Sequence, residues 1–296
     1  VLSVPLGAML ILAGILLAMS PGKPKPFLDA NGNRLAGSIS EKIRVGINGV
    51  QQGMFIMGKD AANPVLLFLH GGTAMPEYFL KQSYAIDLEE YFTVCWWDRR
   101  GAGLTYSADL PRESLTIEQS IEDTLAVTEY LRNRFHREKI YLMAHSGGSL
   151  IGIQAAARAP ELYSAYIGVA QMSWQLRSER LSYEYMVKKY EELGNTKMVR
   201  RLEAAPPTMS VPLPASYMRW RDPAMHGLGV GTTRDMRSVM RGVFLASWLC
   251  REYTVAEKAA LWRGKFSSDR ILWDAVITTD LTTLVQLPGV GRKTAN

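Results

Sequence analysis

The sequence predicts an α/β fold in which a mostly parallel β-sheet is covered by helices. Two observations support this prediction. Between residues 38 and 172, short apolar runs alternate with longer segments whose apolar residues recur at helical spacing. The runs PVLLFLHGG, YFTVCWWDRRGAG and KIYLMAHSGG are mainly apolar until their last residues, which is typical of strands buried on both faces. Such strands, when they alternate with helices, indicate a parallel sheet.

Length and composition exclude several classes of protein. The 296 residues suffice for one large domain or two modest ones, and 47% of them are hydrophobic. The formal net charge of +6 is compatible with nucleic-acid binding, but the cations are scattered, so we do not expect that partner. Cys95 and Cys250 are too few for a disulfide framework and lack the spacing of metal ligands.

The first 22 residues are the most strongly biased segment. The run VLSVPLGAMLILAGILLAMS has no charged side chain, and about twenty apolar residues can span a bilayer. A cleaved signal peptide is the alternative, but no basic region precedes the run, and Pro21 follows the small residues where cleavage would occur. We therefore expect a membrane anchor or an uncleaved signal over residues 1–22. The sequence does not indicate which side of the membrane the remaining chain faces.

The segment from residue 38 to residue 135 begins with a predicted hairpin. The runs EKIRVGI and VQQGMFIMGKD flank Asn48-Gly49, a dipeptide typical of two-residue β-turns. The strands of PVLLFLHGG and YFTVCWWDRRGAG follow. The segment TIEQSIEDTLAVTEYLRNRF then predicts a helix, with Thr116 and Glu118 near its start.

A serine lies where the next strand runs into the next helix. The strand KIYLMAHSGG continues into SLIGIQAAARAP, which Pro160 ends. Ser146 has the small neighbours Ala144 and Gly148 at positions where a sharp strand-to-helix turn leaves little room. This pattern predicts a nucleophile, and the alternative is a serine that only caps the helix. The Gly147 amide is the first candidate donor to an oxyanion.

A pair of glycines follows the earlier strand, in the sequence His70-Gly71-Gly72. Glycines at this position let backbone N–H groups approach a substrate carbonyl, so Gly72 is the second candidate oxyanion donor. A plain glycine turn is the alternative. The presence of Ser146 favours the functional interpretation.

The pattern changes after Gln171. The segment YSAYIGVAQM before it predicts one further buried strand, whereas the segments from residue 173 to about residue 270 are helical and rich in Glu, Arg, Met and Trp. We expect a core domain over residues 38–172 and a helical cap over residues 173–270. The remaining residues, 271–296, are expected to be a truncated or aberrant tail.

The motifs HGGT, WWDRRGAGLTY and AHSGGSLIGIQAAARAPELY together resemble the α/β-hydrolase superfamily, and within it the proline iminopeptidase-related branch. The resemblance covers about residues 41–280. It implies a serine hydrolase, without metal or organic cofactor, that acts on a small peptide or ester through acylation of Ser146. An aminopeptidase-like activity is the favoured form. A carboxylesterase-like hydrolase and a non-catalytic ligand-binding module remain alternatives.

In such aminopeptidases, carboxylates of the cap bind the amino group of the substrate. Four glutamates of the predicted cap are available for this role, although as helix-surface residues they are expected to be solvated: Glu184, Glu191, Glu192 and Glu203.

The sequence offers no obvious base for Ser146. In the family, the acid and the histidine follow the seventh and eighth strands. His70 directly precedes the glycine pair, in the predicted oxyanion loop, and His136 precedes the strand that leads to Ser146. His145 is expected to point away from the catalytic side, and His226 is expected to pack within the cap. We therefore expect the acid and the histidine to be absent and turnover to be weak or absent.

The last ten residues, LPGVGRKTAN, resemble the helix-hairpin-helix motif of endonuclease III-type DNA glycosylases. Lys293 matches the catalytic amine of that family, and the glycines match amides that contact a DNA phosphate. The second helix of the motif is cut off, and the family's iron–sulfur cysteines are missing. We expect a joined or shifted reading frame near residues 281–287 rather than DNA binding, and an exposed sheet edge where hydrolase strands are lost.

Overall fold

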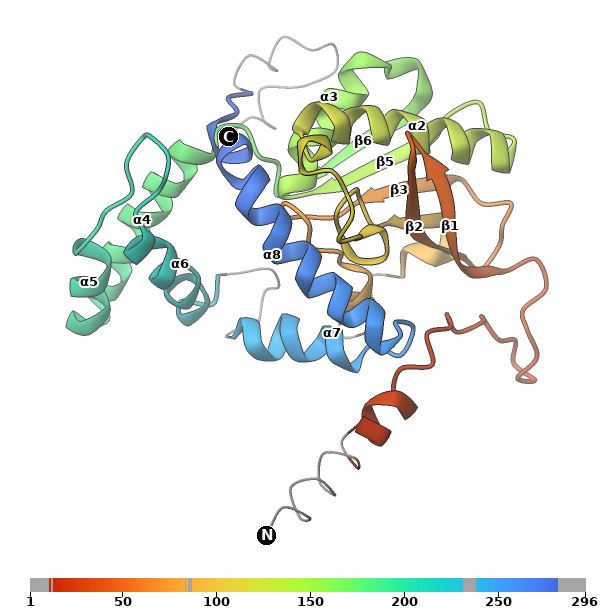
Figure 1. Cartoon of the computed structure of the whole chain (residues 1–296), viewed down its shortest axis with the longest axis horizontal. Helices are drawn as coiled ribbons and strands as arrows, with labels where there is room; N and C mark the ends of the chain where they lie inside the picture. Colours follow the sequence, from red (N-terminus) through yellow and green to blue (C-terminus); the bar gives the residue numbers. More distant parts are fainter. Residues whose placement is uncertain (1–10, 12, 83, 85–86, 231–237, 282–296) are drawn as a thin grey trace. The chain divides into compact units, whose positions relative to one another are not determined.

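The structure is a computed structural model of the chain, and it describes residues 11, 13–82, 84, 87–230 and 238–281 (Figure 1). The chain forms two compact units. The first comprises Val1–Gln171 and Trp248–Trp273, and the second comprises Met172–Ser247 and Asp274–Asn296. The predicted helical stretch over residues 173–270 is therefore divided between the two units, and its role as a cap stays a prediction.

The first unit contains a six-stranded sheet in the order β1-β2-β4-β3-β5-β6. Its strands are β1 (Ile39–Ile47), β2 (Val50–Gly58), β3 (Val65–Leu69), β4 (Thr93–Trp97), β5 (Ile140–His145) and β6 (Tyr163–Val169). The pairs β1–β2 and β2–β4 are antiparallel, whereas β4–β3, β3–β5 and β5–β6 are parallel. The predicted α/β class with a mostly parallel sheet is confirmed.

Local sequence explains the hairpin and the centre of this sheet. Asn48 and Gly49 both have positive φ, 45° and 77°, as the tight turn between β1 and β2 requires, so the predicted hairpin is confirmed. Every residue of β3 and of β4 is buried. Their uninterrupted apolar sequences therefore reflect burial on both faces.

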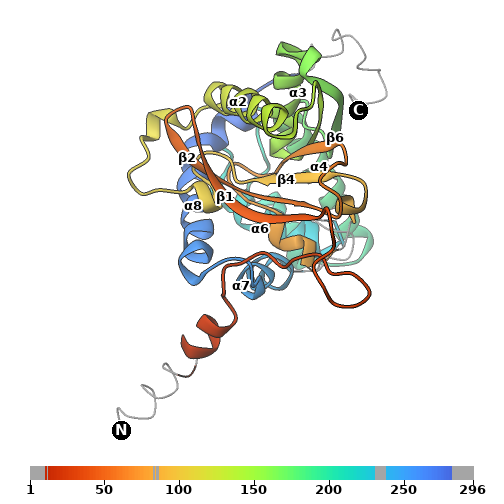
Figure 2. The same ribbon diagram turned by 90° about the vertical axis from the view of Figure 1, so that its right-hand side faces the viewer.

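Two helices of the first unit pack side by side over the sheet, as Figures 1 and 2 show: α2 (Ile117–Phe135) and α3 (Gly147–Arg158). Thr116 caps α2, because its side chain accepts a hydrogen bond of 3.0 Å from the Gln119 amide. Among its described residues, the unit also contains these short 3₁₀ segments: Tyr78–Gln82, Leu88–Glu90, Gly103–Thr105, Arg112–Ser114 and Pro160–Leu162.

The second unit is helical in its described part. Its helices are α4 (Gln175–Glu192), α5 (Thr196–Glu203) and α6 (Ala215–Gly227), followed by a π-helix (Met240–Leu245). Two further helices cross the boundary between the units in sequence: α7 (Ala246–Leu249) and α8 (Val255–Thr278).

A buried ion pair joins α4 to α6. Arg221 Nε lies 2.6 Å from Glu179 Oε2, and the Tyr217 hydroxyl donates to the same oxygen at 2.8 Å. Glu179 is 0% exposed. A carboxylate so far from water is stable only because these donors compensate for its lost hydration.

The predicted membrane anchor over residues 1–22 is wrong. Within the described residues, no helix is long and apolar enough to cross a membrane. Residues 1–10 and 12 lie outside the described part, and residues 13–18 form a short helix that is followed by an extended, proline-containing stretch. The end of this segment is bound by polar contacts, since Lys258 Nζ lies 2.7 Å from Ser20 Oγ and the Gly22 amide donates to the Arg251 carbonyl.

The prediction of a further buried strand over YSAYIGVAQM is only half right. A strand forms there as β6, but of its residues only Tyr163 is buried, and Val169 is 42% exposed. The reason is its position, because β6 is the edge strand of the described sheet beside β5. An edge strand can be as apolar as a central one and still contact solvent. The segment that resembles the helix-hairpin-helix motif, residues 287–296, lies outside the described residues.

Candidate active site

Ser146 occupies a sharp turn between β5 and α3, which we call the elbow (residues 145–148). Its φ and ψ are 48° and −122°, a conformation that costs energy for any residue other than glycine. Hydrogen bonds hold the turn on both sides. The Ser146 amide donates to the Val169 carbonyl at 2.9 Å, and its carbonyl accepts from the amide and hydroxyl of Ser149 at 2.8 and 2.6 Å.

The elbow packs closely against a glycine loop (residues 70–73). As a result, only glycine fits at two positions of the elbow, 147 and 148. A Cβ on Gly148 would lie 2.5 Å from the His70 carbonyl oxygen. A Cβ on Gly147 would lie 2.5 Å from the Gly72 carbonyl oxygen and 3.1 Å from the Gly72 nitrogen. The structure thus brings together all three residues predicted for the site, Ser146, Gly72 and Gly147.

Arg99, two residues after the end of β4, binds the carbonyl oxygens of the glycine loop. Its Nη2 donates to the carbonyls of His70, Gly72 and Thr73 at 3.1, 3.0 and 3.4 Å. The side chain of Arg99 is buried, and this burial lowers its pKa to about 10, so it remains a cation at neutral pH. This role of Arg99 was not predicted from the sequence.

His70 is a buried structural residue. Its Nε2 accepts the Arg99 amide at 3.2 Å, and its Nδ1 lies 3.0 Å from the Gly71 carbonyl oxygen, to which it donates. Burial and the neighbouring charge of Arg99 hold the pKa of His70 well below its usual value. The ring is therefore neutral, and both of its nitrogens have partners.

The glycine loop also contacts a carboxylate that was not predicted as a site residue. Glu77 Oε1 accepts the Gly71 amide at 2.8 Å and lies 2.7 Å from His145 Nδ1. Burial lowers the pKa of His145, but the hydrogen bond and the charge of Glu77 outweigh this, so that its pKa lies above the usual value. One signal was available in the sequence, because Glu77 is the one carboxylate between His70 and Lys81.

No histidine within the described part of the chain forms a hydrogen bond with the Ser146 hydroxyl. His145 instead points toward Glu77, and His136 forms the C-terminal cap of α2 with φ of 50°. His226 is buried in α6, and its two ring nitrogens have no hydrogen-bond partner among the described residues. The predicted absence of a catalytic acid and histidine stays a prediction.

The glutamates considered for binding a substrate amino group are exposed on α4 and α5: Glu184, Glu191, Glu192 and Glu203. Glu184 pairs with Arg180 at 3.2 Å, and Glu192 pairs with Lys189 at 2.7 Å. The part of the chain that the structure describes contains no group of three His, Cys, Asp or Glu side chains that could hold a metal ion.

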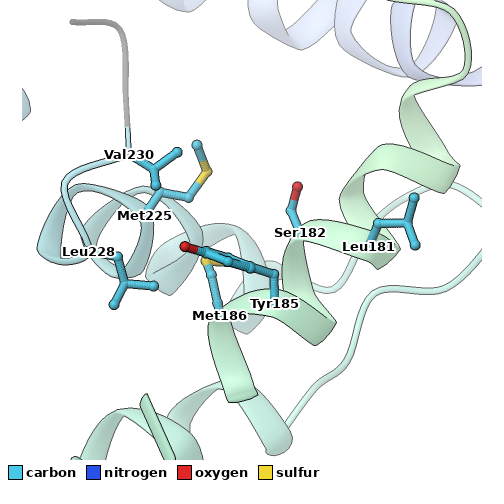
Figure 3. A pocket seen from close by; sticks show the side chains of 7 residues that line it. All are labelled: Leu181, Ser182, Tyr185, Met186, Met225, Leu228 and Val230. Atoms are coloured by element: carbon cyan, nitrogen blue, oxygen red, sulfur yellow. The ribbon is translucent and has the colours of Figure 1, made fainter. Parts of the chain in front are cut away.

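The second unit contains an apolar pocket of about 250 Å³ (Figure 3). Its lining residues come from α4, from α6 and from the segment that follows α6: Leu181, Ser182, Tyr185, Met186, Met225, Leu228 and Val230. In Figure 3 the Tyr185 ring extends from α4 toward the side of the pocket formed by Met225 and Leu228. The pocket suits an apolar group of modest size.

Similarity to known proteins agrees with this architecture. Residues 64–220 match the family described as alpha/beta hydrolase fold. The chain is 35% identical over 172 residues to the probable aminopeptidase YbaC of Bacillus subtilis (strain 168), covering 57% of this chain and 54% of that protein. It is 33% identical over 103 residues to the putative carbamate hydrolase RutD of Agrobacterium fabrum (strain C58), covering 35% and 36%. The chain thus spans about half or less of the length of these relatives.

Among solved structures, a proline iminopeptidase-related protein from Thermus thermophilus superposes with a TM-score of 0.53. The match covers 83% of this chain and 76% of that one, at 20% sequence identity. At this level of identity the similarity establishes the fold alone.

Proposed function

This chain belongs to the α/β-hydrolase fold family, and from that premise we propose that it is a serine hydrolase with Ser146 as its nucleophile. The observation that carries the proposal is the strained conformation of Ser146, with φ of 48°, in a turn packed against the glycine loop. Backbone strain of this kind is typical of functional sites. A serine that only capped α3 would not need it, and Ser146 forms no side-chain cap hydrogen bond.

The proposed reaction is acyl transfer. The Ser146 hydroxyl attacks a substrate carbonyl, and the amides of Gly72 and Gly147 donate to the oxyanion that develops. The tetrahedral intermediate then releases the amine or alcohol of the substrate, which takes up the proton of the serine hydroxyl. Water hydrolyses the acyl-enzyme, frees the carboxylic acid and restores the hydroxyl. We propose that acylation is slow, because the described residues provide no histidine in hydrogen-bonding contact with the Ser146 hydroxyl to take its proton.

A peptide with a free N-terminus is the substrate class that we propose. It is supported by the relative from Bacillus subtilis, which is named a probable aminopeptidase. A small ester is the other substrate that the same acyl-transfer chemistry accepts. We further propose that the helical stretch over residues 173–270 selects the substrate.

The apolar pocket of the second unit favours a second candidate function, the binding of a small apolar ligand without turnover. This candidate does not require a reactive Ser146. A ligand that raises the melting temperature of the wild type and of Ser146→Ala equally, without being cleaved, would support it.

The proposed function is tested by labelling the purified chain with a fluorophosphonate, with Ser146→Ala as the control. Labelling that disappears in Ser146→Ala supports a nucleophilic serine. Equal labelling of both proteins, or no labelling of a chain with a folded circular dichroism spectrum, contradicts it.

A further inference from the structure

The peptide groups of the glycine loop are bound by charges of both signs. Arg99 donates to three of its carbonyl oxygens, while Glu77 accepts the amide of Gly71 at 2.8 Å. Hydrogen bonds to charged groups contribute about 1.5 to 3 kcal/mol each, more than neutral ones. The carbonyl and amide groups of the loop are therefore fixed in direction by strong contacts.

Gly71, like His70 and Gly72, lies close to the elbow. A Cβ on Gly71 would lie 2.7 Å from Glu77 Oε1, 3.0 Å from His145 Nδ1 and 3.2 Å from Ser146 Cβ. The residue that Glu77 binds thus has no room for a side chain beside the proposed nucleophile.

A single oxygen of Glu77 makes both contacts, since Oε1 accepts from Gly71 and lies 2.7 Å from His145 Nδ1. His145 is the last residue of β5 and directly precedes Ser146. The chain of contacts from β5 through His145 and Glu77 to Gly71 therefore links the sheet to the loop across 68 residues of sequence.

We propose that Glu77 and His145 form a positioning pair, which holds the glycine loop against the elbow so that the Gly72 amide stays aimed at the oxyanion. This role rests on the proposed function of Ser146. The pair does not act on the substrate. In the part of the chain that the structure describes, the Gly72 amide has no protein acceptor, whereas the amide of Gly71 is occupied by Glu77.

The pair gives the loop a dependence on pH. Because Glu77 raises the pKa of His145, the ion pair is fully formed below the usual pKa of histidine, about 6.5, and is lost as pH rises through the higher folded value. Two other charged or titratable groups face the pair. His70 stays neutral through its low pKa, and Arg99 interacts with the charge of Glu77 but remains a cation.

Two substitutions of Glu77 separate its contacts. Glu77→Gln keeps an oxygen that accepts the Gly71 amide but removes the charge opposite His145. Glu77→Ala removes both. Glu118→Gln is the matched control, because it breaks an exposed ion pair between Glu118 of α2 and Arg158 of α3. The readouts are the rate of fluorophosphonate labelling between pH 5.5 and 9 and the hydrogen exchange of the peptide that contains Gly71.

We expect Glu77→Ala to label at least about tenfold more slowly than the wild type at every pH, because a displacement of about 1 Å at a reacting centre can cost a hundredfold. Glu77→Gln should label more slowly at low pH only, and its rate should approach the wild-type rate near pH 9. A merely structural role for Glu77 would not produce this convergence. Exchange at Gly71 should be faster in Glu77→Ala than in Glu77→Gln, and unchanged in Glu118→Gln.

The two proposals fail separately. If the wild type labels and Glu77→Ala labels equally fast at all pH values, the positioning role is overturned while the function stands. If the wild type does not label, the proposed function fails, and hydrogen exchange decides the other question. Faster hydrogen exchange at Gly71 in Glu77→Ala than in the wild type would support the claim that Glu77 holds the glycine loop. Unchanged exchange would overturn that claim.

Discussion

The elbow of the first unit and the α4–α6 cluster of the second unit are built by different means. At the elbow, backbone atoms approach so closely that a Cβ on Gly148 would lie 2.5 Å from the His70 oxygen. In the second unit, side chains meet instead, and the buried Glu179 binds Arg221 and Tyr217. The comparison indicates that the close backbone contacts of the elbow fix the position of Ser146, whereas the side-chain contacts of the second unit stabilise the packing of α4 against α6.

The largest effect is expected where the side-chain cluster is broken. Glu179→Ala leaves the Arg221 guanidinium without its buried partner, and breaking a buried pair in this way costs about 3 to 5 kcal/mol. Urea unfolding measures the loss. Glu192→Ala, which removes an exposed carboxylate from the same helix, is the control and should leave the free energy of unfolding unchanged. Equal stability of the two variants would mean that Glu179 does not hold α4 to α6.

A smaller loss of stability, with a larger loss of reactivity, is expected at the elbow. Gly148→Ala forces a Cβ into contact with backbone atoms, and such overpacking costs about 1 to 3 kcal/mol. Because the elbow must shift, fluorophosphonate labelling of Ser146 should fall by about a hundredfold. Gly46→Ala is the control, since its Cβ would meet only the Gln51 side chain at 3.5 Å. Wild-type labelling of a folded Gly148→Ala variant would mean that the close backbone contacts of the elbow do not position Ser146.

A buried carboxyl group in each unit, Asp98 in the first and Glu179 in the second, should make stability respond to pH in opposite directions. Burial raises the pKa of Asp98, at the end of β4, to about 8. The folded state therefore binds a proton that the unfolded state releases between about pH 4 and pH 8, so stability falls as pH rises through that window. For Glu179, burial raises the pKa, but the hydrogen bonds and the charge of Arg221 outweigh this and hold the pKa below its usual value. The stability that Glu179 contributes is therefore lost as pH falls through its pKa in the folded state.

Urea unfolding of Asp98→Asn and of Glu179→Gln from about pH 2.5 to about pH 8 tests this contrast. One proton changes the slope by at most about 1.4 kcal/mol per pH unit. Asp98→Asn should weaken the decline of stability toward pH 8, and Glu179→Gln should weaken the decline of stability below about pH 4.5. If both variants retain the wild-type slope, neither carboxyl group carries the pH dependence.

The smallest effect is expected at the β1–β2 turn, where backbone strain serves no site. Gly49 has φ of 77°, and a Cβ added there would meet no atom within 4 Å, so Gly49→Ala should cost only about 1 kcal/mol from conformation alone. Labelling of Ser146 should not change. A marked loss of labelling would show that strain anywhere in the sheet reaches the elbow.

The elbow and the glycine loop could be predicted because close backbone contacts require glycine, and glycine is visible in sequence. Gly72, Gly147 and the Asn48-Gly49 turn all follow from this constraint. The contacts of Arg99 with the glycine loop and of Glu77 with His145 could not be predicted, because they form between segments 26 to 68 residues apart in the chain. Their partners depend on strand order, which periodicity does not reveal.

Composition led to a wrong prediction over residues 1–22 and to a half-right one at β6, for related reasons. Residues 1–22 have the apolar content of a membrane span, but content does not determine whether a helix continues, and the described helix ends at residue 18. The strand β6 has the sequence of a buried strand, yet it lies at the edge of the described sheet. Hydrophobicity indicates that a segment can be buried, but the elements packed around the segment in the fold decide whether it is.

The contact between Gly148 and the His70 carbonyl has a consequence for how such proteins change over generations. A larger residue at position 148 would clash with the backbone whether or not Ser146 reacts with anything. Purifying selection for folding alone would therefore preserve this glycine in a descendant that had lost its chemistry. The small-residue signature around the serine is, for this reason, a record of ancestry and of packing, and only a reactivity measurement separates a working hydrolase from its inert descendant.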